Sequence, residues 1–423
     1  MRGVNWLGDA VMTTPALLRL REKFPEARIS LLTPEKLVDL WNNHPAIDDV
    51  ISFTRDEGLL HIATRLRAES LKRSLALLRA RREAGRAAYK ETAAMGGTFA
   101  QAIANVAKEV SIETIDSAKE ARKQAIDLAL VLPNSPRSAL EVFFARIPQR
   151  IGYARPWRNI FLTQTIAPRA EAVKMRKRSV AEIKRLVAAD VSRRQTSVSR
   201  VLTHTATGAH QIHEYLHLAA ALGANPEPLP PQLFVTLQEI GAAKEKFKLE
   251  EISTPVLGLN PGAEYGPAKR WPVERFIAAA REIHTRTNCV WLLFGGKSDV
   301  NLTSQIAAAF HAFGIRHHNL AGQTTLRELM VLLKLCRVLL TNDTGPMHVA
   351  AALGTPVVVP FGSTSPELTG PGLPGDPRQQ LLKSDAPCSP CFLRQCPIDF
   401  RCLQGIGVDQ VVNAVGEALQ DEA

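Results

Sequence analysis

Short apolar runs alternate along this chain with longer segments whose apolar residues recur at helical spacing. Residues 28–33 and 50–53 have the pattern of buried strands, and residues 10–24 and 35–41 have the pattern of helices. Residues 1–6 leave less room than a first strand normally takes, so we expect that strand to be clipped or frayed. The first fifty residues therefore predict a βαβαβ unit, the start of a doubly wound parallel sheet.

Two stretches interrupt this alternation. Residues 56–125 carry Ala, Leu and Arg at helical spacing without a strand-like run, and they predict an inserted helical arm. Residues 129–132 then resume the sheet. Residues 168–208 are rich in Arg, Lys, Ser and Thr, and they predict a solvated, irregular loop.

The second half of the chain restarts the alternation of strands and helices. A Pro-rich segment at residues 226–231 is the expected hinge. Because 423 residues exceed what one ordinary core holds, we expect two doubly wound domains, residues 1–228 and residues 229–423. The terminal helix, residues 408–419, is expected to pack back on the first domain.

The stretch 339–361 has the most specific local pattern. An apolar strand ends at Leu340, turn residues follow, and Pro346 opens an Ala-rich helix that Gly354 closes before another buried strand. A helix N-terminus directly after a strand offers free backbone N–H groups to a phosphate. The side chains expected around this anion site are Asp343, Thr344 and His348.

The formal net charge of +11 is unevenly distributed. Residues 51–200 hold 29 Lys and Arg against 14 Asp and Glu, whereas residues 251–423 hold 14 against 15. Such a field favours an anionic partner: nucleic acid, an acidic membrane face or a phosphorylated substrate. A set of solvated basic helices is the alternative. No nucleic-acid recognition motif accompanies the charge, so we expect no nucleic-acid partner.

The composition, with 45% hydrophobic and 22% charged residues, is that of a soluble globular protein. No apolar run approaches the roughly 18 to 20 residues of a membrane helix. The N-terminus lacks the basic-then-apolar design of a secretion signal, so we expect a cytoplasmic protein.

Four of the six cysteines fall in one short segment. In a cytoplasmic chain such a cluster indicates a metal site more readily than disulfides, and a structural zinc site is one interpretation. Reduced thiols that pack a loop are the other. The four residues are Cys388, Cys391, Cys396 and Cys402.

Three polar loops of the second domain follow predicted strands, at residues 261–270, 295–299 and 341–348. Ligands of open α/β sheets bind at that edge. Lys269 and Arg270 of the first loop, together with the helix start in the third, fit a nucleotide diphosphate. The chain has neither the GxxxxGK(S/T) of a P-loop nor a GxGxxG after its first strand, which argues against P-loop NTPases and dinucleotide oxidoreductases.

Several motifs carry a specific resemblance. They are GDAVMTTP at residues 8–15, VLPNS at 131–135, PGAEYGPAKRWP at 261–272 and NDTGPMH at 342–348. Together they resemble glycosyltransferase family 9, and within it the ADP-heptose:lipopolysaccharide heptosyltransferase II branch. The resemblance covers residues 1–55, 126–166 and most of 210–410. It does not extend to the predicted helical arm or to the loop 168–208.

The resemblance implies a GT-B architecture, with two doubly wound Rossmann-like domains facing a cleft. The acceptor would bind the N-terminal domain and the sugar nucleotide the C-terminal domain. The reaction implied is an inverting, metal-independent transfer of heptose from ADP-heptose to the lipopolysaccharide inner core. No cofactor is required in it.

The resemblance also implies roles for individual residues. Asp9 matches the general base that takes the proton of the acceptor hydroxyl, and capping of its helix is the alternative role. For His348 the alternative is a core position, and the acid nearest to the family's ribose contact is Asp299. The matching donor-binding residues are Lys269, Arg270, Asp343, Thr344, Gly345, Met347 and His348. Weaker candidates on the acceptor side are Asn134, Ser135 and Arg155.

The implied partners are ADP-heptose, a lipid A–Kdo–heptose acceptor and the anionic cytoplasmic face of the inner membrane. We therefore expect a cytoplasmic monomer associated peripherally with that membrane through the helical arm and the basic loop. Two other functions stay open. One is a family 9 transferase with a different sugar or acceptor, and the other is an inactive protein that binds nucleotide sugars.

Overall fold

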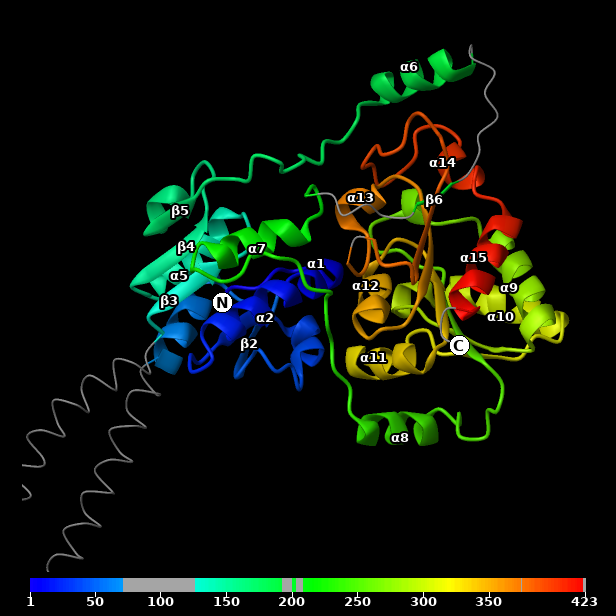
Figure 1. The fold of residues 1–423 in the computed structure, drawn as a ribbon, viewed down its shortest axis with the longest axis horizontal. Coiled ribbons are helices and arrows are strands. Elements are labelled where there is room, and N and C mark those ends of the chain that lie inside the picture. The colour runs from blue at the N-terminus through cyan, green and yellow to red at the C-terminus, as the bar shows by residue number, and fades with distance from the viewer. Residues whose placement is uncertain (71–125, 192–199, 203–207, 374, 421–423) are drawn as a thin grey trace, which may run out of the picture. The chain divides into compact units, whose positions relative to one another are not determined.

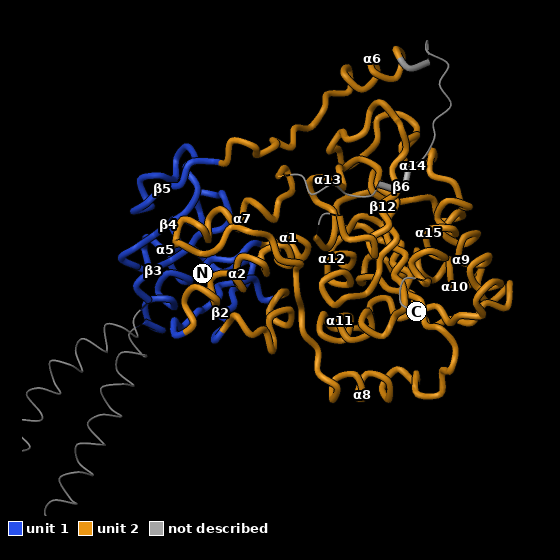
Figure 2. Tube along the Cα trace, in the orientation of Figure 1, with its two compact units in different colours: residues 1–4, 26–35, 48–168 blue, residues 5–25, 36–47, 169–423 orange. Residues whose placement is uncertain are grey.

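A computed structural model describes the chain over residues 1–70, 126–191, 200–202, 208–373 and 375–420. The chain forms two compact units, which Figure 2 colours separately. Unit 1 comprises Met1–Val4, Glu26–Glu35 and Asp48–Pro168, and unit 2 comprises Asn5–Pro25, Lys36–Ile47 and Arg169–Ala423. The domain boundary expected after residue 228 stays a prediction.

Unit 1 is built on a parallel sheet. Strand β1 pairs with β2, and β3, β4 and β5 pair in sequence. The strands are β1 (Ser30–Pro34), β2 (Asp49–Phe53), β3 (Leu128–Val131), β4 (Gln149–Tyr153) and β5 (Gln164–Ile166). Arg2 joins the two sets, because it forms parallel bridges to Leu32 and Val131. With this segment as the first strand, the order is that of a doubly wound sheet.

The N-terminal segment of unit 1 is short, yet it is fastened on both sides. The Arg2 N–H donates to the Leu130 carbonyl at 2.9 Å, and the Leu132 N–H donates to the Arg2 carbonyl at 3.2 Å. The buried Arg2 side chain donates from Nε to Glu141 Oε2 at 2.6 Å. Glu141 lies in α5 (Pro136–Phe144), so this ion pair ties the first strand to a helix.

Unit 2 contains a seven-stranded sheet in the order β6-β12-β11-β10-β7-β8-β9. All neighbours are parallel except β6, which runs antiparallel to β12. The strands are β6 (Arg200–Leu202), β7 (Val256–Asn260), β8 (Val290–Leu293), β9 (His317–Asn319), β10 (Val338–Thr341), β11 (Val357–Phe361) and β12 (Gln379–Lys383). Strands β7 to β12 repeat the doubly wound order of unit 1.

Helices cover both faces of this sheet (Figure 1). On one face lie α9 (Val273–Thr287), α10 (Val300–Ala312) and α15 (Val408–Gln420), and on the other lie α11 (Leu326–Leu335) and α12 (Gly345–Ala352). The other helices of unit 2 are α1 (Leu7–Met12), α2 (Thr14–Lys23), α6 (Val180–Val191), α7 (Ile212–Ala220), α8 (Leu237–Lys246), α13 (Pro366–Thr369) and α14 (Arg401–Gln404). The 3-10 turns are η1 (Glu35–Trp41), η2 (Asn159–Phe161), η3 (Pro267–Lys269) and η4 (Lys297–Asp299).

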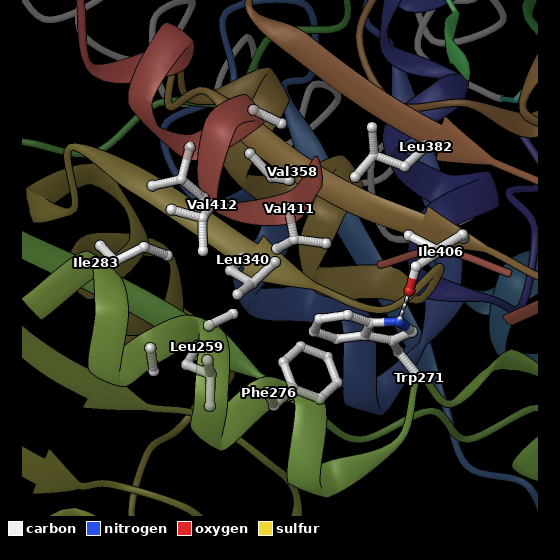
Figure 3. Close-up of a cluster of buried hydrophobic side chains, with 14 of the residues drawn as sticks. Leu259, Trp271, Phe276, Ile283, Leu340, Val358, Leu382, Ile406, Val411 and Val412 are labelled. Atoms are coloured by element: carbon white, nitrogen blue, oxygen red, sulfur yellow. Dashed lines mark hydrogen bonds between the residues drawn. The ribbon is translucent and has the colours of Figure 1, made fainter. Parts of the chain in front are cut away.

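The core of unit 2 lies between the sheet and helices α9 and α15 (Figure 3). Trp271 and Phe276 pack edge to face with ring centroids 5.0 Å apart. The indole N–H of Trp271 donates to the Ile406 carbonyl at 3.1 Å, so the ring is buried without leaving its polar atom unpaired. This packing fixes the polypeptide just after the loop 261–270.

The strand–loop–helix–strand unit expected over residues 339–361 is confirmed. Helix α12 begins at Gly345, one residue before the expected start, and the chain turns at Gly354 with φ +86°. The helix expected over residues 10–24 is instead two helices, α1 and α2, with a break at Thr13.

The terminal helix α15 packs on α9 and on strands β10 to β12 of its own unit, and its expected packing on the first domain stays a prediction. Another expectation needs correction. The expected loop 168–208 contains helix α6 and the edge strand β6. Of the predicted helical arm, residues 59–70 are helical, and residues 71–125 lie outside the described residues. Within the ranges given above, none of the helices combines the length and apolar character required to cross a bilayer.

The buried ion pair of unit 1 generates a prediction about stability. Glu141→Ala leaves the Arg2 guanidinium without its carboxylate in the interior, which should cost about 3–5 kcal/mol. The midpoint of urea unfolding should fall accordingly. The control is Glu22→Ala, because Glu22 is 54% exposed in its pair with Arg19 and should contribute less than about 1 kcal/mol. Equally small losses of stability in Glu141→Ala and Glu22→Ala would contradict the stabilising role of the buried ion pair.

Candidate functional site

A buried amide holds together two polar loops at the carboxyl edge of the unit 2 sheet. Asn342, just after β10, is 0% exposed. Its Oδ1 accepts from the Trp271 N–H at 2.9 Å, and its Nδ2 donates to the Pro261 carbonyl at 2.7 Å. Both partners lie in or beside the loop that follows β7. The two loops that were expected to bind a diphosphate are therefore joined through one side chain.

Lys269 lies where these loops meet. Its Nζ is 2.7 Å from Asp343 Oδ2, and the Thr364 hydroxyl donates to the same oxygen. The ammonium group also lies 5.0 Å from the centre of the Tyr265 ring, a cation–π contact. An ammonium group has three donors, so Asp343 leaves capacity for a further anion. The result is a fixed positive charge at the ligand-binding edge of the sheet.

Asp9 belongs to the same unit as Lys269. It is the third residue of α1, and no side chain caps that helix, so the capping role that we left open for Asp9 does not hold. Burial raises the pKa of the Asp9 carboxyl group to about 6. The positive charge of Lys269 and a hydrogen bond from Gln211 act in the opposite direction, but their effect is smaller. An acid of this kind is ionised near neutral pH and still basic enough to take a proton.

Two glycines allow α1 to approach α12 closely. A Cβ atom on Gly8 would lie 2.6 Å from Cδ2 of His348, and one on Gly345 would lie 2.8 Å from Cδ2 of Leu7. Both distances are shorter than packed atoms tolerate. The glycine pair therefore sets the distance between the helix that carries Asp9 and the helix that begins beside Asp343.

Of the three α12 residues predicted to contact a donor, Met347 and His348 are buried. Met347 is 0% exposed, so the described structure gives it no surface for a ligand. His348 is 6% exposed and packs against Gly8, and burial lowers its pKa to about 3. Its imidazole is therefore neutral, and its Nδ1 has no hydrogen-bond partner. The core position that we kept as an alternative describes His348 well.

Thr344, Gly345 and Arg270 keep more surface. Thr344 is the N-cap residue of α12, but its side chain makes no capping hydrogen bond and stays free for another partner. Arg270 is exposed, with Nη2 3.6 Å from Asp299 Oδ1. The Asp299 carboxylate also accepts from the Gly296 N–H at 3.1 Å. These polar groups line the carboxyl edges of β7, β8 and β10.

The predicted acceptor residues belong to unit 1, whereas Asp9 and the donor residues belong to unit 2. Ser135 is the N-cap of α5 and accepts from the Ser138 N–H at 3.3 Å. Asn134 is exposed beside it. The Arg155 guanidinium lies 5.7 Å from the centre of the Tyr153 ring, at the end of β4. Their role in acceptor binding stays a prediction.

The four clustered cysteines line one small cavity together with Ile183 of α6. All four are free thiols. Burial and, to a smaller extent, the neighbouring thiols raise the pKa of Cys402 to about 12, so this thiol is protonated. Over the described residues, no group of three or more His, Cys, Asp and Glu side chains is arranged to hold a metal ion. The structural zinc site stays a prediction.

Three residues of the site were not expected from the sequence: Gln211, Asn342 and Thr364. Asn342 belongs to a motif that we had quoted, but its role is to join loops. Gln211 and Thr364 lie far along the chain from their partners, Asp9 and Asp343, and no local pattern marks them. Only the fold brings them together.

The chain is similar in sequence to known proteins. The profile of glycosyltransferase family 9 (heptosyltransferase) matches residues 177–400. Lipopolysaccharide heptosyltransferase 2 of Salmonella typhimurium is 28% identical over 377 residues, which cover 87% of this chain and 84% of that protein. The protein of the same name from Escherichia coli K12 is 29% identical with the same coverage.

Solved structures resemble the fold as well. The ADP-heptose lipopolysaccharide heptosyltransferase II structure from E. coli matches with a TM-score of 0.68 and 24% identity, and covers 100% of this chain and 98% of that one. A family 9 glycosyltransferase from Veillonella parvula matches with a TM-score of 0.66 and 19% identity, over 99% and 96% of the two chains. These matches bear out the expected α/β fold of GT-B type.

The close approach of α1 and α12 can be tested with one added methyl group. Gly8→Ala should force the His348 ring and α1 apart, and overpacking of this kind typically costs about 1–3 kcal/mol. The thermal unfolding midpoint should fall. Gly416→Ala in α15 is the matched control, because its added Cβ meets nothing within 4 Å and should stabilise the helix. Unchanged or raised stability in Gly8→Ala would contradict the packing.

Proposed function

Because this chain belongs to glycosyltransferase family 9, we propose that it transfers heptose from ADP-heptose to the inner core of lipopolysaccharide, as a heptosyltransferase of type II. The names of its relatives, at 28% and 29% identity over most of the chain, support this choice of sugar and acceptor. The observation that carries the proposal is the carboxylate of Asp9, with its pKa of about 6, in electrostatic contact with Lys269.

The donor diphosphate is proposed to bind between Lys269 and the N-terminus of α12. Lys269 offers the donors that Asp343 does not use, and Gly345 places a backbone N–H at the start of α12. Pro346 has no N–H, and the Met347 N–H donates to the Thr344 carbonyl at 3.2 Å. Thr344 adds a hydroxyl at the same helix start. Arg270 and Asp299 are proposed to contact the nucleoside end, since they lie on the adjoining loops.

The Asp9 carboxylate then acts as the general base. It accepts the proton of an acceptor hydroxyl while that oxygen forms a bond to the anomeric carbon of heptose. The bond from the anomeric carbon to the phosphate oxygen breaks at the same time, and ADP carries away the electron pair. Attack from the face opposite the leaving group inverts the anomeric centre. The negative charge that develops on ADP meets Lys269 and the positive end of the α12 dipole.

The acceptor is proposed to be a lipid-anchored core oligosaccharide, with the protein peripheral to the cytoplasmic face of the inner membrane. The excess of basic residues in 51–200 supports this location, because an acidic membrane face attracts such a surface. Within unit 1, Asn134, Ser135 and Arg155 are the residues proposed to meet the acceptor.

The direct test incubates the purified protein with ADP-heptose and a core acceptor that lacks the heptose. Mass spectrometry should detect the acceptor with one heptose added, and nucleotide analysis should detect ADP in equal amount. An inactive nucleotide-sugar-binding protein would bind ADP-heptose without releasing ADP. A family 9 transferase of other specificity would release ADP only with another sugar nucleotide or acceptor.

Asp9→Asn should separate activity from stability. The variant should retain binding of ADP-heptose and lose transfer, because an amide takes no proton. The pKa of Asp9 is about 6 in the folded protein, above the ordinary value of 3.8. Protonated Asp9 therefore stabilises the folded state at low pH, and this stabilisation is lost as the pH rises through 6. Asp9→Asn should therefore melt at a higher temperature than the unaltered protein at pH 8. At pH 4 the two should melt alike.

The pH dependence of transfer provides a further test. The value of kcat/KM should rise with pH and reach half its maximum near pH 6, as Asp9 loses its proton. Lys269→Met removes a charge that lowers this pKa, so the rising limb should move to higher pH and donor affinity should fall. Lys244→Met, at an exposed position in α8, is the control and should alter neither. If the rising limb of the pH profile of kcat/KM does not move in Lys269→Met, the electrostatic effect of Lys269 on the pKa of Asp9 is refuted.

A further inference from the structure

We propose that unit 1 carries a docking surface for an anionic lipid bilayer, formed by the loop after β4 and the end of α5. Trp157 and Ile160 insert into the interfacial layer of the membrane, and arginines beside them meet the lipid phosphates. This inference rests on the membrane location proposed above and names the surface that would dock. Binding to a bilayer is measured without donor or acceptor, so its failure is distinguishable from a failure of the transfer reaction. We call the surface, defined by Phe143, Phe144, Trp157 and Ile160, the aromatic edge.

The aromatic edge displays large apolar side chains to solvent. Trp157 is 86% exposed and Ile160 is 79% exposed, only three residues apart. Phe143 and Phe144, at the end of α5, are 38% and 44% exposed. Single exposed apolar residues are common on protein surfaces, but four in one locality mark an interaction site.

The loop that bears Trp157 and Ile160 is held by hydrogen bonds. The Arg155 N–H donates to Asn159 Oδ1 at 2.8 Å, and the Leu162 N–H donates to the Asn159 carbonyl at 3.1 Å. Beneath the loop, the buried Arg158 guanidinium donates from Nη1 to the Pro133 carbonyl at 2.6 Å. The exposed side chains are therefore presented on a fixed backbone.

Trp157 occupies a backbone conformation that a large aromatic residue seldom takes. Its φ is +65°, in the left-handed region where Gly and Asn are favoured. Such a conformation costs free energy, and the exposed indole recovers none of it through packing within unit 1. Strain combined with exposure favours a role for this side chain outside the fold.

Contacts between aromatic rings join the two halves of the aromatic edge. The Phe143 ring lies 5.5 Å from the Phe144 ring and 5.4 Å from the ring of Phe161, the neighbour of Ile160. The Arg150 guanidinium lies 5.4 Å from the centre of the Phe143 ring. The end of α5 is thus joined through Phe161 to the loop that bears Ile160, with a cation at the junction.

The charge around the aromatic edge is positive. Residues 136–166 contain five arginines and one acidic residue, a net charge of +4. The acid is Glu141, which is 0% exposed and already pairs with Arg2 and Arg137. Arg146 is exposed two residues after Phe144. An incoming anionic surface therefore meets exposed cations and no exposed carboxylate in this segment.

This combination fits a lipid interface better than a protein partner. Trp is enriched where a bilayer meets water, because its ring is apolar and its N–H is polar. Each arginine near an anionic membrane adds about 1 kcal/mol of attraction. A protein partner would also have to satisfy the polar groups of the loop, most of which are already used within it.

The test measures binding of the full chain to vesicles. Vesicles of phosphatidylcholine with phosphatidylglycerol should bind the protein, vesicles of phosphatidylcholine alone should bind it much less, and added salt should weaken binding. Trp157→Asn with Ile160→Ser should lower the partition coefficient at least about tenfold, because burial of an aromatic ring is lost. Asn accepts the backbone conformation at position 157, so the fold should be kept, as its unfolding midpoint will show.

Tryptophan emission gives an independent readout. Of the five tryptophans, Trp41, Trp271 and Trp291 are at most 3% exposed, and Trp157 is much more exposed than Trp6 at 48%. Vesicles should shift the emission to shorter wavelength and protect it from acrylamide, and Trp157→Asn should remove most of both effects. Arg146→Asn, which suits its own φ of +58°, should weaken binding only to anionic vesicles.

Leu237→Ser is the matched control, since Leu237 is 87% exposed in unit 2 and lies outside the aromatic edge. It should bind vesicles as the unaltered protein does. Equal binding by the unaltered protein and the Trp157→Asn, Ile160→Ser variant would overturn the proposal, and would assign membrane binding to other basic segments. Absence of binding to any vesicle would overturn it as well.

Discussion

The site of this protein depends on the close packing of α1 against α12. Gly8 and Gly345 leave no side chain between the two helices, and the His348 ring and Leu7 fill the remaining space. This packing brings an acid from the beginning of the chain to a cation that follows β7. Neither residue alone suggests catalysis, but together they give a base and an anion site within one compact unit.

The same packing lowers the stability of the folded protein, because it buries polar groups of the site. Asp9 loses more through burial than it regains from Lys269 and Gln211, so its pKa is raised. His348 is buried as a neutral imidazole with an unpaired Nδ1. A charge and a polar atom that are poorly compensated in the resting protein are typical of functional sites. The surrounding core of Trp271, Phe276 and helix α15 supplies the rigidity that holds them.

Local patterns predicted the elements of the fold well, because strands, caps and turns depend on neighbouring residues. Sequence patterns predict the strand–loop–helix–strand unit at 339–361, the polar loop with Lys269 and an acid at the start of the first helix, Asp9. Helix α6 was not predicted, because its stretch is rich in Arg, Lys, Ser and Thr and resembles a solvated loop. Gln211 and Thr364 escaped notice for another reason, since their partners lie 202 and 21 residues away.

The pair of Lys269 and Asp343 also bears on how the protein completes a cycle of the proposed reaction. After transfer, ADP carries more negative charge than ADP-heptose did, so a free lysine would retain the product more tightly than the substrate. Asp343, 2.7 Å from the ammonium group and buried, offsets part of that attraction. In the proposed reaction this carboxylate would lower the affinity for the product and favour release of ADP, so one ion pair would both position the ammonium group and limit how tightly it binds ADP.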